Sequence, residues 1–72
     1  MATDRRLRLK EWRDHRFLTQ VGLAERSGVS ERAIVRLEKP NAPAPRVSTV
    51  VNLAKGLGIE PADLYRSPRK GE

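Results

Sequence analysis

Two arginines at helical spacing, Arg32 and Arg36, carry the most informative chemistry in this chain of 72 residues. A helix places positions i and i+4 on one face, and an arginine can donate two hydrogen bonds to the edge of a guanine. Glu31 stands next to Arg32, and its carboxylate can accept a hydrogen bond from cytosine N4. The alternative for Glu31 is that it only complements the dipole at a helix N-terminus. Residues of these types on one helix can therefore hydrogen-bond to polar partners, base edges among them.

The elements that must position these side chains are predicted to be short helices, because no segment alternates polar and apolar residues with the period of a strand. We expect helices over about residues 4–16, 20–27, 31–38, 47–57 and 61–65. Thr19 and Ser30 precede the second and third helices as N-caps. Gly28 and Gly58 follow the second and fourth helices, where a left-handed residue commonly ends a helix. Prolines between positions 39 and 45 predict a stiff loop.

Apolar residues at helical spacing predict one small all-α core. Trp12 lies three positions after Leu9, so we expect it to pack in the core rather than to stack on a base. Ile34 and Leu37 are expected to point inward, which leaves positions 31, 32, 35 and 36 outside. The other expected core residues are Leu23, Val50, Leu53, Ala54 and Leu57. The single histidine, His15, is expected to be exposed on the first helix.

The composition limits the chain to one small basic domain, expected over residues 1–66 with a flexible basic tail over 67–72. Fifteen Lys and Arg residues against nine Asp and Glu residues give a formal net charge of +6, which favours a polyanionic partner. The chain has no cysteine and one histidine, so we expect no metal and no cofactor. We also expect no membrane span, a cytoplasmic location and no enzymatic activity, because no nucleophile stands beside a base.

Residues 20–39, QVGLAERSGVSERAIVRLEK, fit two short helices that cross at a turn. Ala24 is small where the helices approach, Gly28 is permissive in the turn, and apolar residues lie on both sides. The stretch resembles the helix-turn-helix of phage-repressor and Cro-like regulators, the Xre family, and NLAKGLGI and DLY also match. The resemblance spans about residues 9–65. It implies a compact five-helix, lambda-repressor-like domain whose third helix enters the major groove of double-stranded DNA.

The resemblance also implies contacts to the phosphate backbone. Gln20 matches a phosphate-binding position at a helix N-terminus, where free N–H groups and the dipole favour anions. Arg46 follows the proline loop, near a basic position of the family that approaches the backbone or the minor groove. The expected phosphate contacts are Thr19, Gln20, Ser30, Lys39 and Arg46.

Two further sets of residues receive roles from the resemblance. Arg13 and Glu38 match a partly buried ion pair between the first and third helices. The family dimer surface falls at the junction of the fourth and fifth helices. In this chain that junction holds Ile59, Glu60, Pro61 and Ala62.

The chain departs from the family pattern near both helices of the motif. Val21 and Gly22 stand where related sequences carry acidic or polar residues, so the second helix is expected to be short or frayed. Pro40 replaces the usual glycine after the third helix, and the following loop is mostly Ala and Pro. We therefore expect fewer phosphate contacts than the family average.

The main hypothesis is a sequence-specific transcriptional regulator that represses as a homodimer, formed in solution or only on DNA. Glu31, Arg32, Val35 and Arg36 would read bases, Val35 by touching a thymine methyl group. The alternative is a protein-interaction module, such as an antitoxin-like or phage regulatory partner protein, because Val21 and Val35 are predicted to be exposed. Salt separates the two, because DNA binding weakens steeply as the salt concentration rises.

Overall fold

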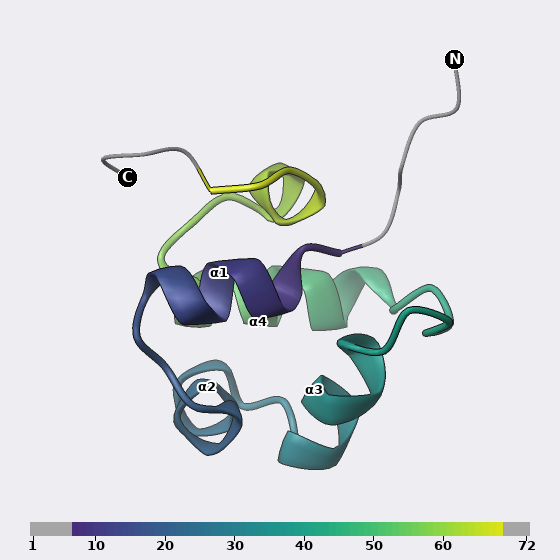
Figure 1. The fold of residues 1–72 in the computed structure, drawn as a ribbon, viewed down its shortest axis with the longest axis horizontal. Helices are drawn as coiled ribbons and strands as arrows, with labels where there is room; N and C mark the ends of the chain where they lie inside the picture. The colour runs from purple at the N-terminus through teal and green to yellow at the C-terminus, as the bar shows by residue number, and fades with distance from the viewer. Residues whose placement is uncertain (1–6, 69–72) are drawn as a thin grey trace.

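The computed structural model describes residues 7–68, which form four α-helices and one short 3-10 helix. In chain order these are α1 (Leu9–His15), α2 (Gln20–Ser27), α3 (Glu31–Leu37), α4 (Val47–Leu57) and η1 (Pro61–Tyr65). Helix α4 packs against both α2 and η1, and α2 packs against α3. Figure 1 shows α2 and α3 on one side of α4 and η1 on the other. Residues 7–68 contain no strand, so the all-α prediction is confirmed.

Helix α1 begins later than predicted. The sequence predicted a helix from about position 4, but Leu7 and Arg8 are not helical and α1 starts at Leu9; positions 4–6 lie outside the described residues. Arg8 has φ −94° and ψ 44°, and its backbone N–H donates to the carbonyl of Leu64 at 2.7 Å. The chain entering α1 therefore bonds to η1 instead of extending the helix.

The fifth element is a 3-10 helix rather than an α-helix. Pro61 opens it, and the backbone N–H of Asp63 donates to the carbonyl of Glu60 at 2.9 Å, the spacing of a 3-10 turn. The backbone N–H of Glu60 in turn donates to Asp63 Oδ2 at 3.1 Å, which closes a capping box. The predicted count of five α-helices is therefore replaced by four α-helices and one 3-10 helix.

The N-cap of α2 and the glycines that end α2 and α4 lie where the sequence predicted them. Thr19 Oγ1 accepts a hydrogen bond from the backbone N–H of Gly22 at 2.9 Å, so α2 is capped and spans its full predicted length despite the glycine. Gly28 follows α2 with φ 77° and Gly58 follows α4 with φ 73°, both in the left-handed conformation.

Phe17 closes α1 in the same way, which the sequence did not predict. Its φ is 57°, the only positive φ of a non-glycine residue in the described part of the chain. The N–H of Phe17 donates to Asp14 O at 3.0 Å and the N–H of Leu18 donates to Arg13 O at 2.9 Å, the hydrogen-bond pattern of a Schellman motif. A left-handed backbone costs a residue with a Cβ about 1–2 kcal/mol, so Phe17 occupies a position where glycine is favoured.

The core draws buried apolar side chains from every element. They are Leu9, Trp12, Leu23, Ile34, Val50, Leu53, Ala54, Leu57 and Leu64. Each fully buried large side chain contributes about 1.5–3 kcal/mol to folding. Leu64 was not predicted, whereas Leu37 is half-buried at the core edge and not fully buried as expected. His15 is also half-buried, because its ring meets the Trp12 ring edge-on at 5.9 Å.

The described end of the chain remains in contact with α1. Ser67 donates a hydrogen bond from Oγ to Glu11 Oε1 at 2.9 Å, so part of the segment predicted as a flexible tail contacts the domain. Residues 69–72 of that predicted tail lie outside the described residues. None of the described helices is long and apolar enough to cross a membrane.

Candidate nucleic-acid interface

Helix α3 is anchored at its start and along one face. Ser30 Oγ accepts from the backbone N–H of Ala33 at 3.2 Å, which satisfies one of the free N–H groups of the first turn. Ile34 is fully buried and fixes the inward face of the helix. Val29 lies in the turn before α3, is half-buried and packs against the core. The turn and the helix therefore have one preferred orientation on α2.

The opposite face of α3 is polar and open to solvent. Glu31, Arg32 and Arg36 are exposed. None of the three makes a side-chain hydrogen bond or ion pair to another residue within positions 7–68. Val35, which was expected to be exposed, is half-buried. The structure thus brings three of the four predicted base-reading residues onto one free face and partly covers the fourth.

The predicted phosphate contacts differ in their surroundings. Thr19, Ser30, Lys39 and Arg46 are exposed. The two hydroxyls accept backbone N–H groups as caps, which leaves each hydroxyl hydrogen available to a phosphate. Arg46 stands at the N-cap of α4 without a side-chain cap bond.

Gln20 is the exception among these residues, because it points inward. It is half-buried, and its Nε2 donates to Glu38 Oε1 at 3.1 Å. A primary amide has two N–H donors, so one donor remains after this bond. Gln20 therefore links the start of α2 to the residue that follows α3.

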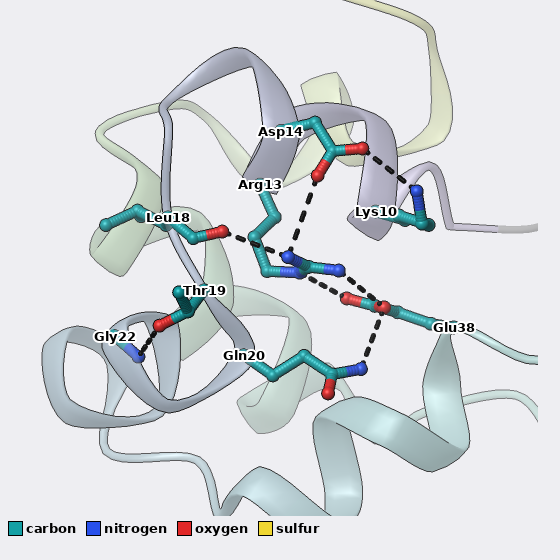
Figure 2. A network of polar contacts seen from close by, with 8 residues as sticks. All are labelled: Lys10, Arg13, Asp14, Leu18, Thr19, Gln20, Gly22 and Glu38. Carbon is teal, nitrogen blue, oxygen red and sulfur yellow. Dashed lines mark hydrogen bonds and ion pairs between the residues drawn. The ribbon is translucent and has the colours of Figure 1, made fainter.

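Arg13 and Glu38 form a two-point ion pair at the centre of the network drawn in Figure 2. Arg13 Nε lies 2.8 Å from Glu38 Oε2, and Arg13 Nη2 lies 3.0 Å from Glu38 Oε1. Their side chains are only 12% and 7% exposed. Arg13 Nη1 also donates to the carbonyl of Leu18 at 3.0 Å and lies 3.6 Å from Asp14 Oδ1. The hydrogen bond to Glu38 raises the pKa of the Arg13 guanidinium, although burial acts in the opposite direction.

This network ties three segments of the chain together. Arg13 belongs to the last turn of α1, Leu18 to the connection before α2, and Glu38 is the C-cap of α3. Because both oxygens of the carboxylate are held, the C-terminal end of α3 cannot swing relative to α1 without breaking charged hydrogen bonds. The pair therefore sets the position from which α3 presents its polar face.

The predicted dimer surface forms one continuous stretch at the junction of α4 and η1. Glu60 and Ala62 are exposed, whereas Ile59 and Pro61 are half-buried. Ile59 packs against the core. The stretch is thus a mixed surface with both a polar and an apolar component.

Sequence reasoning missed the most exposed of the large apolar side chains within residues 7–68. Phe17 is 94% exposed, and Val21, four positions further on, is 51% exposed, as predicted. Phe17 lies two residues after the end of α1 and has a positive φ, as Gly28 has directly after α2. The half-burial of Val35 removes one of the two features that favoured a protein-interaction surface.

A groove of about 950 Å³ lies beside the predicted interface and was not expected from the sequence. Leu7, Leu9 and Leu37 line it together with Pro43 and Tyr65. Among the described residues no group of three or more His, Cys, Asp or Glu residues could hold a metal ion. The groove lies between the start of α1 and the loop after α3, and charged residues, Arg8, Lys10 and Glu38 among them, line it as well.

The fold and the pair of helices define a helix-turn-helix domain, and comparison with known proteins gives the family. The family model for the helix-turn-helix domain matches residues 6–66, so the chain belongs to this family. The restriction-modification controller protein C.AhdI from Aeromonas hydrophila is 32% identical, with a TM-score of 0.73 over 79% of this chain and 85% of that one. These findings confirm the resemblance to the phage-repressor and Cro-like regulators. A search of curated proteins found no match.

Two structures of a biofilm regulator share the fold at lower identity. SinR in complex with DNA is 20% identical, with a TM-score of 0.75 over 82% of this chain and 94% of that one. The N-terminal DNA-binding domain of SinR from Bacillus subtilis is 22% identical, with a TM-score of 0.74 over 90% of this chain and 91% of that one. The chain therefore has the fold of DNA-binding transcription regulators.

Proposed function

We propose that this protein is a sequence-specific regulator of transcription that binds double-stranded DNA and reads the major groove with α3. The observation that carries the proposal is the free polar face of α3, where Glu31, Arg32 and Arg36 are exposed and have no partner within residues 7–68. Charged side chains held on an anchored helix, with nothing to satisfy them internally, are available to base edges.

Each side chain of this face has its own proposed role. Arg32 and Arg36 each donate to O6 and N7 of a guanine, and Glu31 accepts from N4 of a cytosine. Val35 is half-buried, so it exposes less side-chain surface than the two arginines. Its proposed contact is with the methyl group of a thymine. The operator half-site is therefore expected to be rich in G·C pairs opposite α3.

The backbone contacts position the domain without reading sequence. Thr19, Ser30, Lys39 and Arg46 are exposed and can reach phosphates. Gln20 contributes through the donor that its bond to Glu38 leaves unused. The net charge of +6 supplies the salt-dependent part of the affinity through counterion release.

We further propose that the protein acts as a homodimer that represses by occluding the polymerase. The surface of Ile59, Glu60, Pro61 and Ala62 brings two copies together, so that the two α3 helices enter successive major grooves about 34–36 Å apart. A palindromic operator follows from the two-fold symmetry of such a dimer.

Selection from a pool of random duplexes, carried out at low and at moderate salt, tests this function. The proposal predicts enrichment of a palindrome whose half-sites lie about one helical turn apart. Binding that is enriched for no sequence and disappears at moderate salt would contradict sequence-specific regulation, because it would reflect phosphate contact alone.

A second candidate function is a protein-interaction module of the antitoxin-like or phage-regulatory kind. The exposure of Phe17 and Val21 favours it, because large exposed apolar side chains are common at protein interfaces. The two functions respond differently to salt. An apolar protein complex should persist at the salt concentration that abolishes DNA binding.

A further inference from the structure

The indole of Trp12 caps the 3-10 helix η1 from the other end of the chain. Its Nε1 donates to the carbonyls of Asp63 and Arg66, each at 2.9 Å. Trp12 is fully buried, so water does not compete for this N–H group. The carbonyl of Asp63 also accepts the backbone N–H of Arg66 at 3.1 Å, so the indole adds a second donor at Asp63 and a donor from α1 at Arg66.

A five-residue 3-10 helix depends on such contacts, because its own hydrogen bonds are few and of poor geometry. Leu64 is buried and holds η1 against the core. An apolar contact is non-directional, so it fixes the depth of η1 better than its rotation. Directional contacts to η1 include the two bonds from Trp12 and the bond from the backbone N–H of Arg8 to Leu64 O at 2.7 Å.

A second hydrogen bond from α1 fixes the chain before the proposed dimer surface. Arg16 donates from Nε to the carbonyl of Leu57, the last residue of α4, at 3.1 Å. The Arg16 guanidinium also lies 5.8 Å from the centre of the Trp12 ring, and that of Arg66 lies 5.6 Å from it. Such cation–π contacts add to the attraction between these groups.

The stretch Ile59–Ala62 therefore lies between two points that α1 holds. Leu57 is fixed before it through Arg16, and the carbonyls of Asp63 and Arg66 are fixed after it through Trp12. We propose that Trp12 is a positioning residue, whose indole N–H holds η1 so that two copies of the chain can meet through Ile59–Ala62. This inference rests on the dimer surface of the proposed function.

Trp12→Phe tests the proposal, because it keeps a buried aromatic ring and removes the N–H donor. The readout is the ratio of affinities for a duplex with both half-sites of the selected palindrome and a duplex with one. We expect Trp12→Phe to lower this ratio about tenfold, the effect of one net hydrogen bond per protomer, and to leave binding to one half-site unchanged. Val50→Ala is the matched control: it removes buried volume from α4 away from the hydrogen bonds of Trp12 and Arg16, and it should lower stability without changing the ratio.

Each of the following outcomes would overturn the proposal. An unchanged ratio in Trp12→Phe would show that the N–H does not position the surface. Equal losses on both duplexes, or the same fall in Val50→Ala, would show a general effect of stability. If wild type selects a palindrome but binds the duplex with two half-sites no more tightly than the duplex with one, the proposed dimer is wrong. If wild type selects no palindrome, the proposed function is wrong.

Hydrogen exchange of the indole N–H tests the bonds of Trp12 to Asp63 and Arg66 even if Trp12→Phe does not fold. The chain has a single tryptophan, so its indole signal in an NMR spectrum is unambiguous. Slow exchange is expected, because the N–H is buried and bonded to two carbonyls. Exchange at the rate of an exposed indole would overturn the proposal without any DNA measurement.

Discussion

Gly56 of α4 lies against Ser27, the last residue of α2, at a distance that leaves no room for a side chain. A Cβ built on Gly56 would meet Ser27 Cβ at 2.9 Å and Ser27 Cα at 3.0 Å. This close approach lets α4 pack directly on the helix pair that carries the proposed interface. The glycine is therefore required by tertiary packing, although it sits inside a helix where it costs about 1 kcal/mol relative to alanine.

Gly56→Ala is expected to lower the free energy of unfolding by about 1–3 kcal/mol, because the added methyl group must push the backbone of Ser27 away. Gly22→Ala in α2 is the matched control. Its Cβ would meet only the side chains of Thr19 and Leu18, at 3.2 and 3.6 Å. Urea denaturation should show that Gly22→Ala is neutral or more stable than wild type, and equal losses in both variants would refute the close-packing explanation.

Phe17→Gly is expected to stabilise the protein by about 0.5–1 kcal/mol. It relieves the left-handed strain at φ 57°. Part of this stabilisation is lost, because glycine raises the conformational entropy of the unfolded chain. The side chain is 94% exposed, so little burial is lost. Gly58→Ala is the reverse test: nothing lies within 4 Å of its Cβ, and only the strain should destabilise it. A lower melting temperature for Phe17→Gly would contradict this account.

Glu38→Ala is expected to cost about 3–5 kcal/mol, because it leaves the buried Arg13 charge without its partner. Lys10→Ala, which removes the exposed pair with Asp14, should have a much smaller effect. The pKa of Arg13 is raised, so its contribution is present below the ordinary arginine pKa and is lost only as pH rises above it. Stability from Arg13 ionisation should therefore not change across neutral pH. Equal unfolding midpoints for Glu38→Ala and Lys10→Ala would show that the ion pair of Arg13 and Glu38 does not stabilise the protein.

The sequence predicted the helix caps and helix ends, because these depend on residues close together in the chain. Thr19, Ser30 and Gly28 act within one or two turns of the chain, so their roles follow from residue type and spacing. The bonds of Trp12 to η1 join residues 51 and 54 positions apart, and no periodicity reveals them. The inward turn of Gln20 depends in the same way on where α3 ends.

The proposed interface was predicted in part for the same reason. The spacing of Arg32 and Arg36 with the inward Ile34 predicted a free polar face, and these two residues are exposed. The half-burial of Val35 depends on its tertiary surroundings, which sequence spacing does not specify. The strain at Phe17 was visible only as an unusual residue at a helix end.

Arg46→Ala is expected to weaken binding to all duplexes equally, because the proposed contact is to phosphate. The slope of log affinity against log salt should fall by about 1. Fluorescence anisotropy with the selected palindrome and with a scrambled duplex measures both quantities. A loss confined to the palindrome would instead assign Arg46 to base recognition.

The central claim is that the outer face of α3 reads base sequence, and parallel selections with wild type, Arg36→Ala and Glu31→Gln test it most directly. Arg36→Ala is expected to cost about 1–3 kcal/mol on the wild-type palindrome and to relax the preference at one base pair in each half-site. Glu31→Gln is expected to change the base preferred at a different position, because an amide can pair with adenine where the carboxylate accepts from cytosine. If both variants select the wild-type palindrome with unchanged preferences, α3 does not read the sequence.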